Sequence, residues 1–163
     1  MNTVEFSTAA AQRAAAEGQL EQWIYRYLQA GEWANIGLLQ GLQLQRRWWI
    51  GPLEAELAWL NRCCGPEPGM EYPVPQLAWD EHITRLSSGL TDPLDVPPLI
   101  VVYNAGEFSV RDGNHRHEAM RRKGWLKCWV VIWHNSLEDF EAGEKLLAVY
   151  NGGSDNDELS VEL

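Results

Sequence analysis

Basic residues are scarce in this chain of 163 residues, which holds 13 Lys and Arg against 23 Asp and Glu and has a formal net charge of −10. The acidic excess lies mostly in residues 136–163, where one Lys stands against eight acidic side chains. General nucleic-acid binders neutralise phosphates with clusters of Lys and Arg. The one basic run here, Arg121-Arg122-Lys123, suits the cationic last turn of a helix. The composition therefore disfavours nucleic acid as a partner.

Cysteines are few as well, and the sequence has no CxxC pair and no long apolar run. The three cysteines are Cys63, Cys64 and Cys128, and adjacent cysteines fit the geometry of a disulfide poorly. This usage is typical of a reduced, intracellular protein. No segment approaches the roughly 18 apolar residues of a membrane span, and the N-terminus lacks the basic start and apolar core of a signal peptide. We therefore expect a cytoplasmic protein with no membrane contact.

Apolar residues make up 45% of the chain and include nine Trp, which is enough for one domain with a core. Apolar side chains recur at helical spacing over 7–30, with Ser7 as N-cap, and predict an amphipathic helix. A second helix is predicted over 35–49, with Asn35 as its cap. We expect this helical pair to form an extension over residues 1–50. Its apolar face would pack on the rest of the chain or on another protomer, so a homodimer through these helices is one outcome.

After residue 50 the pattern changes to short segments separated by turns. Residues 53–60 fit a strand, because apolar residues alternate with glutamates, and fit a helix equally well. Residues 62–75 contain four Pro and two Gly, which excludes a regular element and predicts a loop of a length often used for function. The other predicted elements are a helix over 76–88, a strand hairpin over 98–112, a helix over 114–123 that ends at Gly124, and a strand over 125–133 whose Trp129, Val131 and Trp133 face the core.

The most informative stretch is the junction between this hairpin and the following helix, Asp112-Gly113-Asn114-His115-Arg116. Asp112-Gly113 breaks the strand, and the helix begins near Asn114. Free N–H groups at a helix start favour anions. The guanidinium of Arg116 adds a planar donor fork that suits phosphate. The junction therefore predicts a small cradle for a phosphate or a carboxylate.

Each side chain at this junction also has a structural interpretation that the sequence leaves open. Asp112 either coordinates Mg²⁺ or positions a substrate, or it caps the helix or forms an Asx turn. Arg116 either binds phosphate or forms a salt bridge, for example to Asp112. His115 donates to a phosphate or acts in proton transfer, or it is a buried structural histidine. His117 points to another helix face, where we expect it at the surface. A zinc site made of these histidines and the cysteines lacks the ligand spacing.

The order of elements over 51–135, with the motif Asp-Gly-x-His-Arg-x-x-Ala at 112–119, resembles the ParB/sulfiredoxin superfamily. Its members include the N-terminal domains of chromosome-partition proteins, the sulfiredoxins and a free-serine kinase. The resemblance implies an α+β fold, a small mixed β-sheet with helices over 51–135. The helical extension over 1–50 precedes this domain, and an acidic helix to about residue 150 and a disordered tail make up residues 136–163.

In that superfamily the loop and helix start hold nucleotide phosphates, from ATP in some members and from CTP in others. By resemblance, Gly113, Asn114, His115 and Arg116 contact phosphate here. Sulfiredoxins carry a reactive Cys where this chain has Asn114, so we expect no sulfinic-acid reductase activity. Partition proteins carry Gly-Glu-Arg-Arg, where Asn114 and His115 replace the Glu and the first Arg. Only 28 residues follow position 135 and they are acidic, so we expect no role in DNA segregation.

The kinase-like members match this loop better, because they carry Asp-Gly-x-His at the helix start. In them an acidic residue of an earlier loop activates a hydroxyl, and Glu67 or Glu71 fills that role by resemblance. The plain alternative is that both are solvated loop carboxylates. A carboxylate beside a phosphate requires Mg²⁺ between them, and Asp112 is the candidate metal ligand. The implied catalytic set is Asp112, His115 and either Glu67 or Glu71.

We weigh three functions for such a cradle. The leading one is a nucleotide-binding domain that uses ATP or CTP with Mg²⁺ and supports phosphoryl transfer or nucleotide hydrolysis. The alternative is a non-catalytic module that senses a nucleotide or another anion, or that serves protein interaction. The third, a ParB-like nuclease, ranks last because the chain is acidic.

Overall fold

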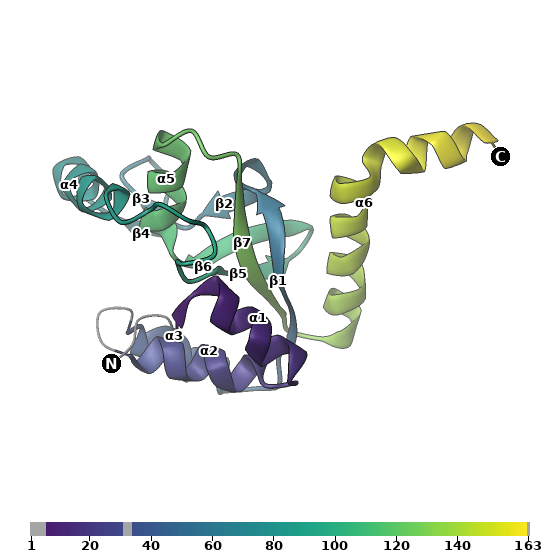
Figure 1. The fold of residues 1–163 in the computed structure, drawn as a ribbon, viewed down its shortest axis with the longest axis horizontal. Helices are drawn as coiled ribbons and strands as arrows, with labels where there is room; N and C mark the ends of the chain where they lie inside the picture. The colour runs from purple at the N-terminus through teal and green to yellow at the C-terminus, as the bar shows by residue number, and fades with distance from the viewer. Residues whose placement is uncertain (1–5, 31–33, 163) are drawn as a thin grey trace.

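The computed structural model describes residues 6–30 and 34–162, with side chains through residue 152. Its centre is a five-stranded mixed sheet with helices on both sides (Figure 1). One layer holds α1 (Thr8–Ala16), α2 (Leu20–Gln29) and α3 (Ile36–Leu42). The other holds α5 (Asn114–Arg122) and α6 (Leu137–Glu162), with α4 (Gln76–Ser87) packed on α5. This arrangement confirms the predicted α+β fold class.

The strand order is β1-β7-β5-β6-β2, which combines two antiparallel and two parallel pairs. The predicted hairpin is β5–β6, and its turn residues Ala105 and Gly106 both have positive φ, 51° and 83°, as in a type I′ turn. The strands are β1 (Trp48–Glu56), β2 (Leu60–Arg62), β5 (Leu99–Asn104), β6 (Glu107–Asp112) and β7 (Lys127–His134), while β3 (Cys64–Gly65) and β4 (Tyr72–Pro73) form a separate parallel pair.

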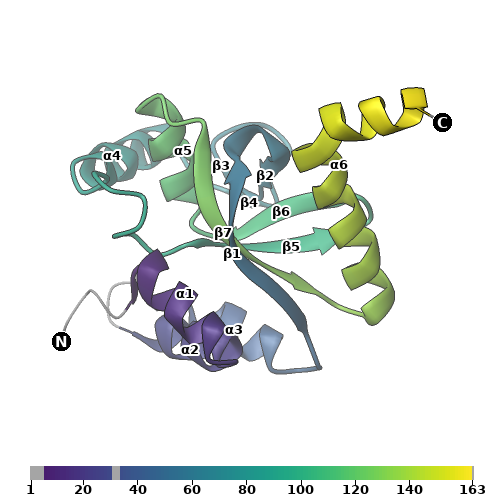
Figure 2. The same ribbon diagram turned by 45° about the vertical axis from the view of Figure 1, so that its right-hand side comes forward.

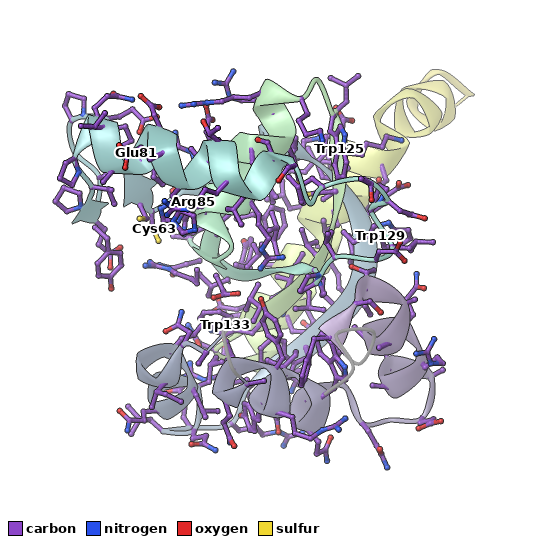
Figure 3. The ribbon with its side chains drawn as sticks, turned by 60° about the vertical axis from the view of Figure 1, so that its left-hand side comes forward. Cys63, Glu81, Arg85, Trp125, Trp129 and Trp133 are labelled. Carbon is purple, nitrogen blue, oxygen red and sulfur yellow. The ribbon has the colours of Figure 1, made fainter. Side chains whose placement is uncertain are left out.

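The two faces of the sheet bury two different apolar cores. Side chains alternate between faces along a strand. Ile100, Val102, Val131 and Trp133 face the N-terminal helices, while their sequence neighbours on β5 and β7 face α5 and α6. Trp133 lies beside the N-terminal helices, whereas Trp125 packs against the other core (Figure 3). The chain therefore needs both helical layers to cover its sheet.

The N-terminal segment differs from the prediction in where its helices end. The helix expected over 7–30 is divided into α1 and α2, because the chain turns at Gly18, whose φ is +74°. The second helix, expected over 35–49, ends at Leu42. Trp48 and Trp49 instead begin β1 and pair with β7. Tertiary pairing with β7 therefore decides the structure of this tryptophan pair.

Both predicted caps of these helices are confirmed. Ser7 Oγ accepts a hydrogen bond from the N–H of Ala10 at 3.1 Å. Asn35 Oδ1 accepts one from the N–H of Leu38 at 3.2 Å. Each cap satisfies an N–H group that its helix leaves unpaired.

The apolar face of α1 and α2 packs on the chain's own sheet. Ile24 and Leu28 are fully buried in the core that they share with Ile100. Thr8 donates from both its N–H and its hydroxyl to the carbonyl of Val96, each at 2.8 Å. Sequence analysis left open whether this apolar face packs on the same chain or on a second protomer. In the structure, the sheet of the same chain covers it.

The elements from α4 to α5 are confirmed, including the stop at Gly124, whose φ is +84°. The ambiguous segment 53–60 continues β1 through Glu56 and then forms the 3₁₀ turn η3 (Leu57–Trp59). The loop over 62–75 is irregular apart from the short pair β3 and β4.

The C-terminal elements show two differences. The closing strand begins at Lys127 and leaves Trp129 only half-buried. Where disorder was expected after residue 150, the backbone of α6 continues to Glu162 beyond a non-helical Gly152. The end of α6 projects away from the sheet (Figure 2). In the described part of the chain, no helix combines the length and apolar character needed to cross a membrane.

The basic residues at the end of α5 form contacts within the protein. Arg121 and Arg122 pair with the buried carboxylate of Glu118 at 2.6 and 2.9 Å. The hydrogen bond from Arg121 lowers the pKa of Glu118 to about 2. Lys123 donates to the carbonyl of Leu90 at 2.7 Å. The run therefore fixes the end of α5, in agreement with its interpretation as a helix terminus.

If the N-terminal helices and the sheet share one core, truncating that core should destabilise the whole molecule. We expect Leu28→Ala to lower the free energy of unfolding by about 2–5 kcal/mol, because Leu28 is fully buried. The control, Leu44→Ala, removes a side chain that is 85% exposed and should change it by less than about 0.5 kcal/mol. Urea unfolding followed by circular dichroism and by tryptophan fluorescence measures both. Two separate transitions would contradict a shared core.

Candidate functional site

The start of α5 is shaped by a glycine that no other residue can replace without strain. Gly113 is the N-cap and has φ +96°. A Cβ at this position would lie 2.5 Å from Leu99 Cδ2 and 2.9 Å from Arg116 Nη2. Gly113 has no side chain that could cap the helix, and within the described residues no hydrogen bond joins the N–H groups of Asn114 and His115 to the protein. The hairpin thus delivers an uncapped helix N-terminus at the end of β6.

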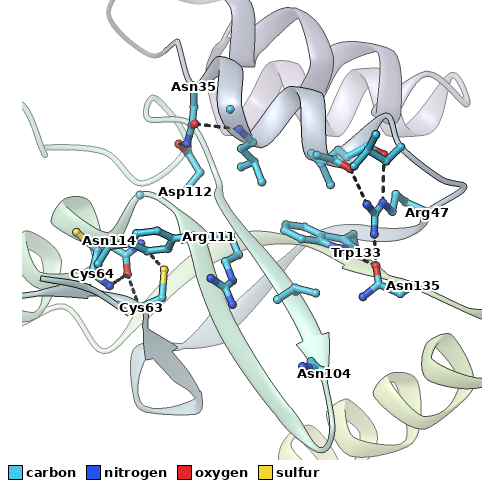
Figure 4. Close-up of a pocket in the computed structure, with 18 of the residues that line it drawn as sticks. Asn35, Arg47, Cys63, Cys64, Asn104, Arg111, Asp112, Asn114, Trp133 and Asn135 are labelled. Atoms are coloured by element: carbon cyan, nitrogen blue, oxygen red, sulfur yellow. Dashed lines mark hydrogen bonds between the residues drawn. The ribbon is translucent and has the colours of Figure 1, made fainter. Parts of the chain in front are cut away.

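Two cavities meet at this helix start. The larger cleft, about 860 Å³, lies between α3, the β5–β6 hairpin and the Cys63-Cys64 segment (Figure 4). The second, about 370 Å³, lies toward α2 and α4 and is lined by Tyr27 and His82. Both cavities are lined by Asp112, Gly113, Asn114 and His115, together with Asn35. Four of the predicted site residues therefore line both cavities, and a fifth, Arg116, lines the second cavity alone.

Arg116 forms the salt bridge that the sequence left open as its alternative. Its side chain is buried, and Nη2 donates to Asp112 Oδ2 at 3.2 Å and to the hydroxyl of Tyr27 at 2.9 Å. Nη1 donates to the carbonyl of Pro97. These bonds hold the guanidinium beneath the helix start, so that it supports the cradle from inside.

Asp112 joins the N-terminal helices to this cluster. Its Oδ2 also accepts from the hydroxyl of Tyr27 at 2.9 Å, and its Oδ1 accepts from Nδ2 of Asn35 at 3.3 Å. Burial raises the pKa of Tyr27, so its phenol stays protonated and donates. Sequence analysis missed Tyr27 because it lies among apolar residues at helical spacing, and nothing in its neighbours signals a polar partner.

The buried amide of Asn114 connects α5 to the cysteine segment. Its Oδ1 accepts from the N–H groups of Cys63 and Cys64 at 2.9 and 3.4 Å. Its Nδ2 donates to the carbonyl of Val110 at 3.1 Å. The three thiols of the chain are free, as expected. Because its side chain is occupied, Asn114 can offer a ligand only its backbone N–H.

His115 is half-buried against two other rings. Its ring centroid lies 4.4 Å from that of Trp79 and 4.0 Å from that of His82. Burial, followed by the nearby charge of His82, lowers the pKa of His115 to about 4. The imidazole is therefore neutral at pH 7. His117 was expected at the surface, but it is buried and its Nε2 lies 3.1 Å from the carbonyl of Leu57.

The two candidate bases are both engaged in ion pairs. Glu67 pairs with Arg62 and does not line the two cavities or the neighbouring one. Glu71 Oε1 lies 3.0 Å from Nη1 of Arg111, which lines the large cleft. The hydrogen bond from each arginine lowers the pKa of its glutamate, so both carboxylates are charged at neutral pH. Of the two, Glu71 is the one whose arginine partner lines the large cleft.

The described residues do not fit a metal centre built from side chains. Both oxygens of Asp112 already accept hydrogen bonds. Within residues 6–30 and 34–152, no group of three His, Cys, Asp or Glu side chains is placed to hold an ion. Mg²⁺ usually binds through one or two carboxylates together with substrate phosphates. A metal at Asp112 would thus depend on the ligand that accompanies it.

Arg111 is the functional candidate that sequence analysis passed over. Phe108 and Val110 on β6 are buried toward α5 and α6. Arg111 lies at the register shift between Val110 and Asp112, and its side chain lines the large cleft. Its side chain is 27% exposed, and its one carboxylate partner, Glu71, is 51% exposed. The other arginine of the cleft, Arg47, donates to the carbonyls of Leu42 and Gly41 at the end of α3. Its position directly before Asp112-Gly113 was the signal that could have found Arg111.

Comparison with known proteins assigns no family to the chain. No protein-family model matches it, and no curated protein matches it. Among solved structures, it is similar to the C-terminally truncated chromosome-partitioning protein ParB from Caulobacter crescentus, complexed with CTP-gamma-S. The TM-score is 0.41 and the identity 22%, and the match covers 63% of this chain and 53% of the ParB chain. The chain thus spans about half the length of that protein, and the similarity is too loose to transfer a ligand or a role.

The lowered pKa of His115 predicts a pH-dependent stability. Because the pKa is about 4 in the folded protein and 6.5 normally, the unfolded chain binds the proton more readily. Stability should therefore fall as pH falls from 6.5 toward 4. We expect the melting temperature of His115→Asn to fall less than that of the wild type over this window. An imidazole that titrates near 6.5 in an NMR experiment on the folded protein would contradict this prediction.

Proposed function

We propose that this chain binds a small phosphate-bearing ligand where α5 begins. The observation that supports the proposal is the uncapped helix start at Gly113, which opens into a cleft of about 860 Å³. Backbone N–H groups and the positive end of the helix dipole favour an anion at such a point. The glycine at position 113 permits this turn, because the backbone has a positive φ and because Leu99 and Arg116 occupy the space of a Cβ.

In this proposal some of the predicted residues contact the ligand, and others hold the start of α5 in position. The N–H groups of Asn114 and His115 donate to the phosphate, and the neutral imidazole of His115 offers one further hydrogen bond. Arg111 supplies the cation, because an exposed ion pair such as Arg111–Glu71 is weak and phosphate accepts two parallel bonds from a guanidinium. Asp112 and Arg116 position the helix start and do not touch the ligand.

A nucleotide is the ligand class that the sequence resemblance implies, and phosphoryl transfer or nucleotide hydrolysis with Mg²⁺ is its catalytic form. Glu71 is better placed than Glu67 to act as a base there, once a ligand has drawn Arg111 away from it. The described side chains do not form a metal site, so Mg²⁺ would be held together with the phosphates of the nucleotide. A measurement of product formation separates an enzyme from a non-catalytic module. Binding of ATP or CTP without any product over hours supports the non-catalytic module.

The binding proposal is tested with one matched pair of arginine variants. We expect thermal shifts and calorimetry to detect binding of pyrophosphate, ATP or CTP, with and without Mg²⁺. Arg111→Gln should weaken binding roughly tenfold or more, since a charge-assisted hydrogen bond contributes about 1.5–3 kcal/mol. The control is Arg85→Gln, because Arg85 is exposed on α4 and lines neither cavity. If no anion binds, or if both variants bind like the wild type, the proposal is wrong.

Glu71 should act as an internal competitor for Arg111. Removing its charge in Glu71→Gln should raise the affinity for pyrophosphate by up to about fivefold, which corresponds to the 0.2–1 kcal/mol of an exposed ion pair. Glu67→Gln is the control, because Glu67 pairs with Arg62 instead. Calorimetry measures both affinities. A decrease in affinity in Glu71→Gln would show that Glu71 does not compete for the arginine.

A further inference from the structure

Beyond the start of α5, the open part of the sheet carries a row of polar side chains. Alternation along β6 places Glu107 and Ser109 on one face, opposite the buried Phe108 and Val110, and Arg111 lines the same cavity as these two residues. Register extends this row across the sheet, because Asn61 of β2 pairs with Ser109 and Asn104 of β5 pairs with Glu107. We call Asn61, Asn104, Glu107 and Ser109 the polar floor.

The polar floor lies beside the proposed phosphate site. A third cavity of about 290 Å³ is lined by the four floor residues and by Arg111. The large cleft shares Arg111 and Asn104 with this cavity. Figure 4 shows these two side chains on the same hairpin, below Trp133 and α3. A ligand held at Arg111 therefore continues directly onto the floor.

The floor residues have unused hydrogen-bonding capacity. Within the part of the chain whose side chains are described, no hydrogen bond joins the side chains of Asn61, Asn104, Glu107 or Ser109 to the protein. Two amides, a hydroxyl and a carboxylate offer both donors and acceptors. This mixture matches hydroxyl groups, which donate and accept at once. The apolar surface of the cavity is limited to Met70, Val102 and Cys63.

The two ends of the site carry opposite charges. Glu107 and Arg111 are four residues apart on one strand, which separates their Cα atoms by about 13 Å. Arg62 and Glu71 also line this cavity, and each is held in an ion pair, Arg62 with Glu67 and Glu71 with Arg111. A phosphate that displaces Glu71 from Arg111 is attracted to that end of the site and repelled from the Glu107 end. The uncharged part of a ligand must then lie over Ser109 and Asn61, toward Glu107. A second charged phosphate on the floor would meet the carboxylate.

From this arrangement we infer that the polar floor binds the polyhydroxylated part of a phosphorylated ligand, a sugar or similar polyol. Its phosphate lies at Arg111 and the start of α5, and its hydroxyls bond to Glu107, Ser109 and Asn61. The inference rests on the proposed function and specifies the class of ligand. A site that hydrogen-bonds hydroxyls discriminates against analogues that lack them, because its own polar groups then go unpaired.

The test compares ribose 5-phosphate with propyl phosphate, which carries the same charge and no hydroxyls. We expect calorimetry to give ribose 5-phosphate at least about tenfold higher affinity. Glu107→Ala and Ser109→Ala should each remove much of this advantage and leave the affinity for propyl phosphate unchanged. Glu54→Ala, which changes an exposed residue of β1 outside all three cavities, should change neither affinity. Melting temperatures confirm that each variant is folded.

The possible results distinguish a failure of the polyol subsite from a failure of the proposed phosphate site. Equal affinities for the two phosphates, or an advantage that survives both floor variants, would overturn the polyol subsite and leave phosphate binding intact. Binding of neither compound, together with no response to pyrophosphate, would overturn both.

Discussion

The carboxylate of Asp112 is the point at which the two halves of the molecule are joined. It accepts from Tyr27 of α2, from Asn35 at the start of α3 and from Arg116 of α5. Removing one partner of a buried charged cluster leaves the other charge unpaired, which costs more than a surface ion pair contributes. The cluster also fixes the turn at Gly113, because the guanidinium of Arg116 lies against the space that a Cβ would occupy there. The position of the N-terminal helices and the shape of the helix start therefore depend on one another.

This constraint explains why the residues most suggestive in the sequence are not the ones that face the cleft. Arg116 follows the glycine, as a phosphate ligand in such a motif would, but its side chain is buried and directed toward Pro97 and Tyr27. Asn114 uses its whole amide to hold Cys63 and the end of β6. Both side chains build the cradle, and the backbone N–H groups remain its binding element. The side chains of the motif thus determine the shape of the helix start, and most of them do not contact the ligand themselves.

Local patterns predicted the local structure well. The caps at Ser7 and Asn35, the hairpin and the helix stop at Gly124 each depend on residues within a few positions of one another, and each is confirmed. Trp48 and Trp49 were assigned to a helix because only their pairing with β7, more than 80 residues away, makes them a strand. Tyr27 and Arg111 were missed for the same reason, since their partners Asp112 and Glu71 are distant in sequence. Whether a polar residue is available to a ligand therefore depends on partners that are distant in sequence and that only the fold brings close.

The charges at the cleft bear on which phosphates it suits. Arg116 is paired with Asp112, Arg47 donates to the carbonyls that end α3, and His115 is neutral at pH 7, which leaves Arg111 and the helix dipole to meet an anion. One cation and a partial helix charge match a phosphate monoester better than a triphosphate, whose additional charges are usually neutralised by a metal ion or by more arginines. The net charge of −10 adds repulsion that is only partly screened at physiological salt. Affinity for a small phosphate must then come largely from uncharged contacts, and the amides and hydroxyl of the polar floor are the groups beside Arg111 that supply them.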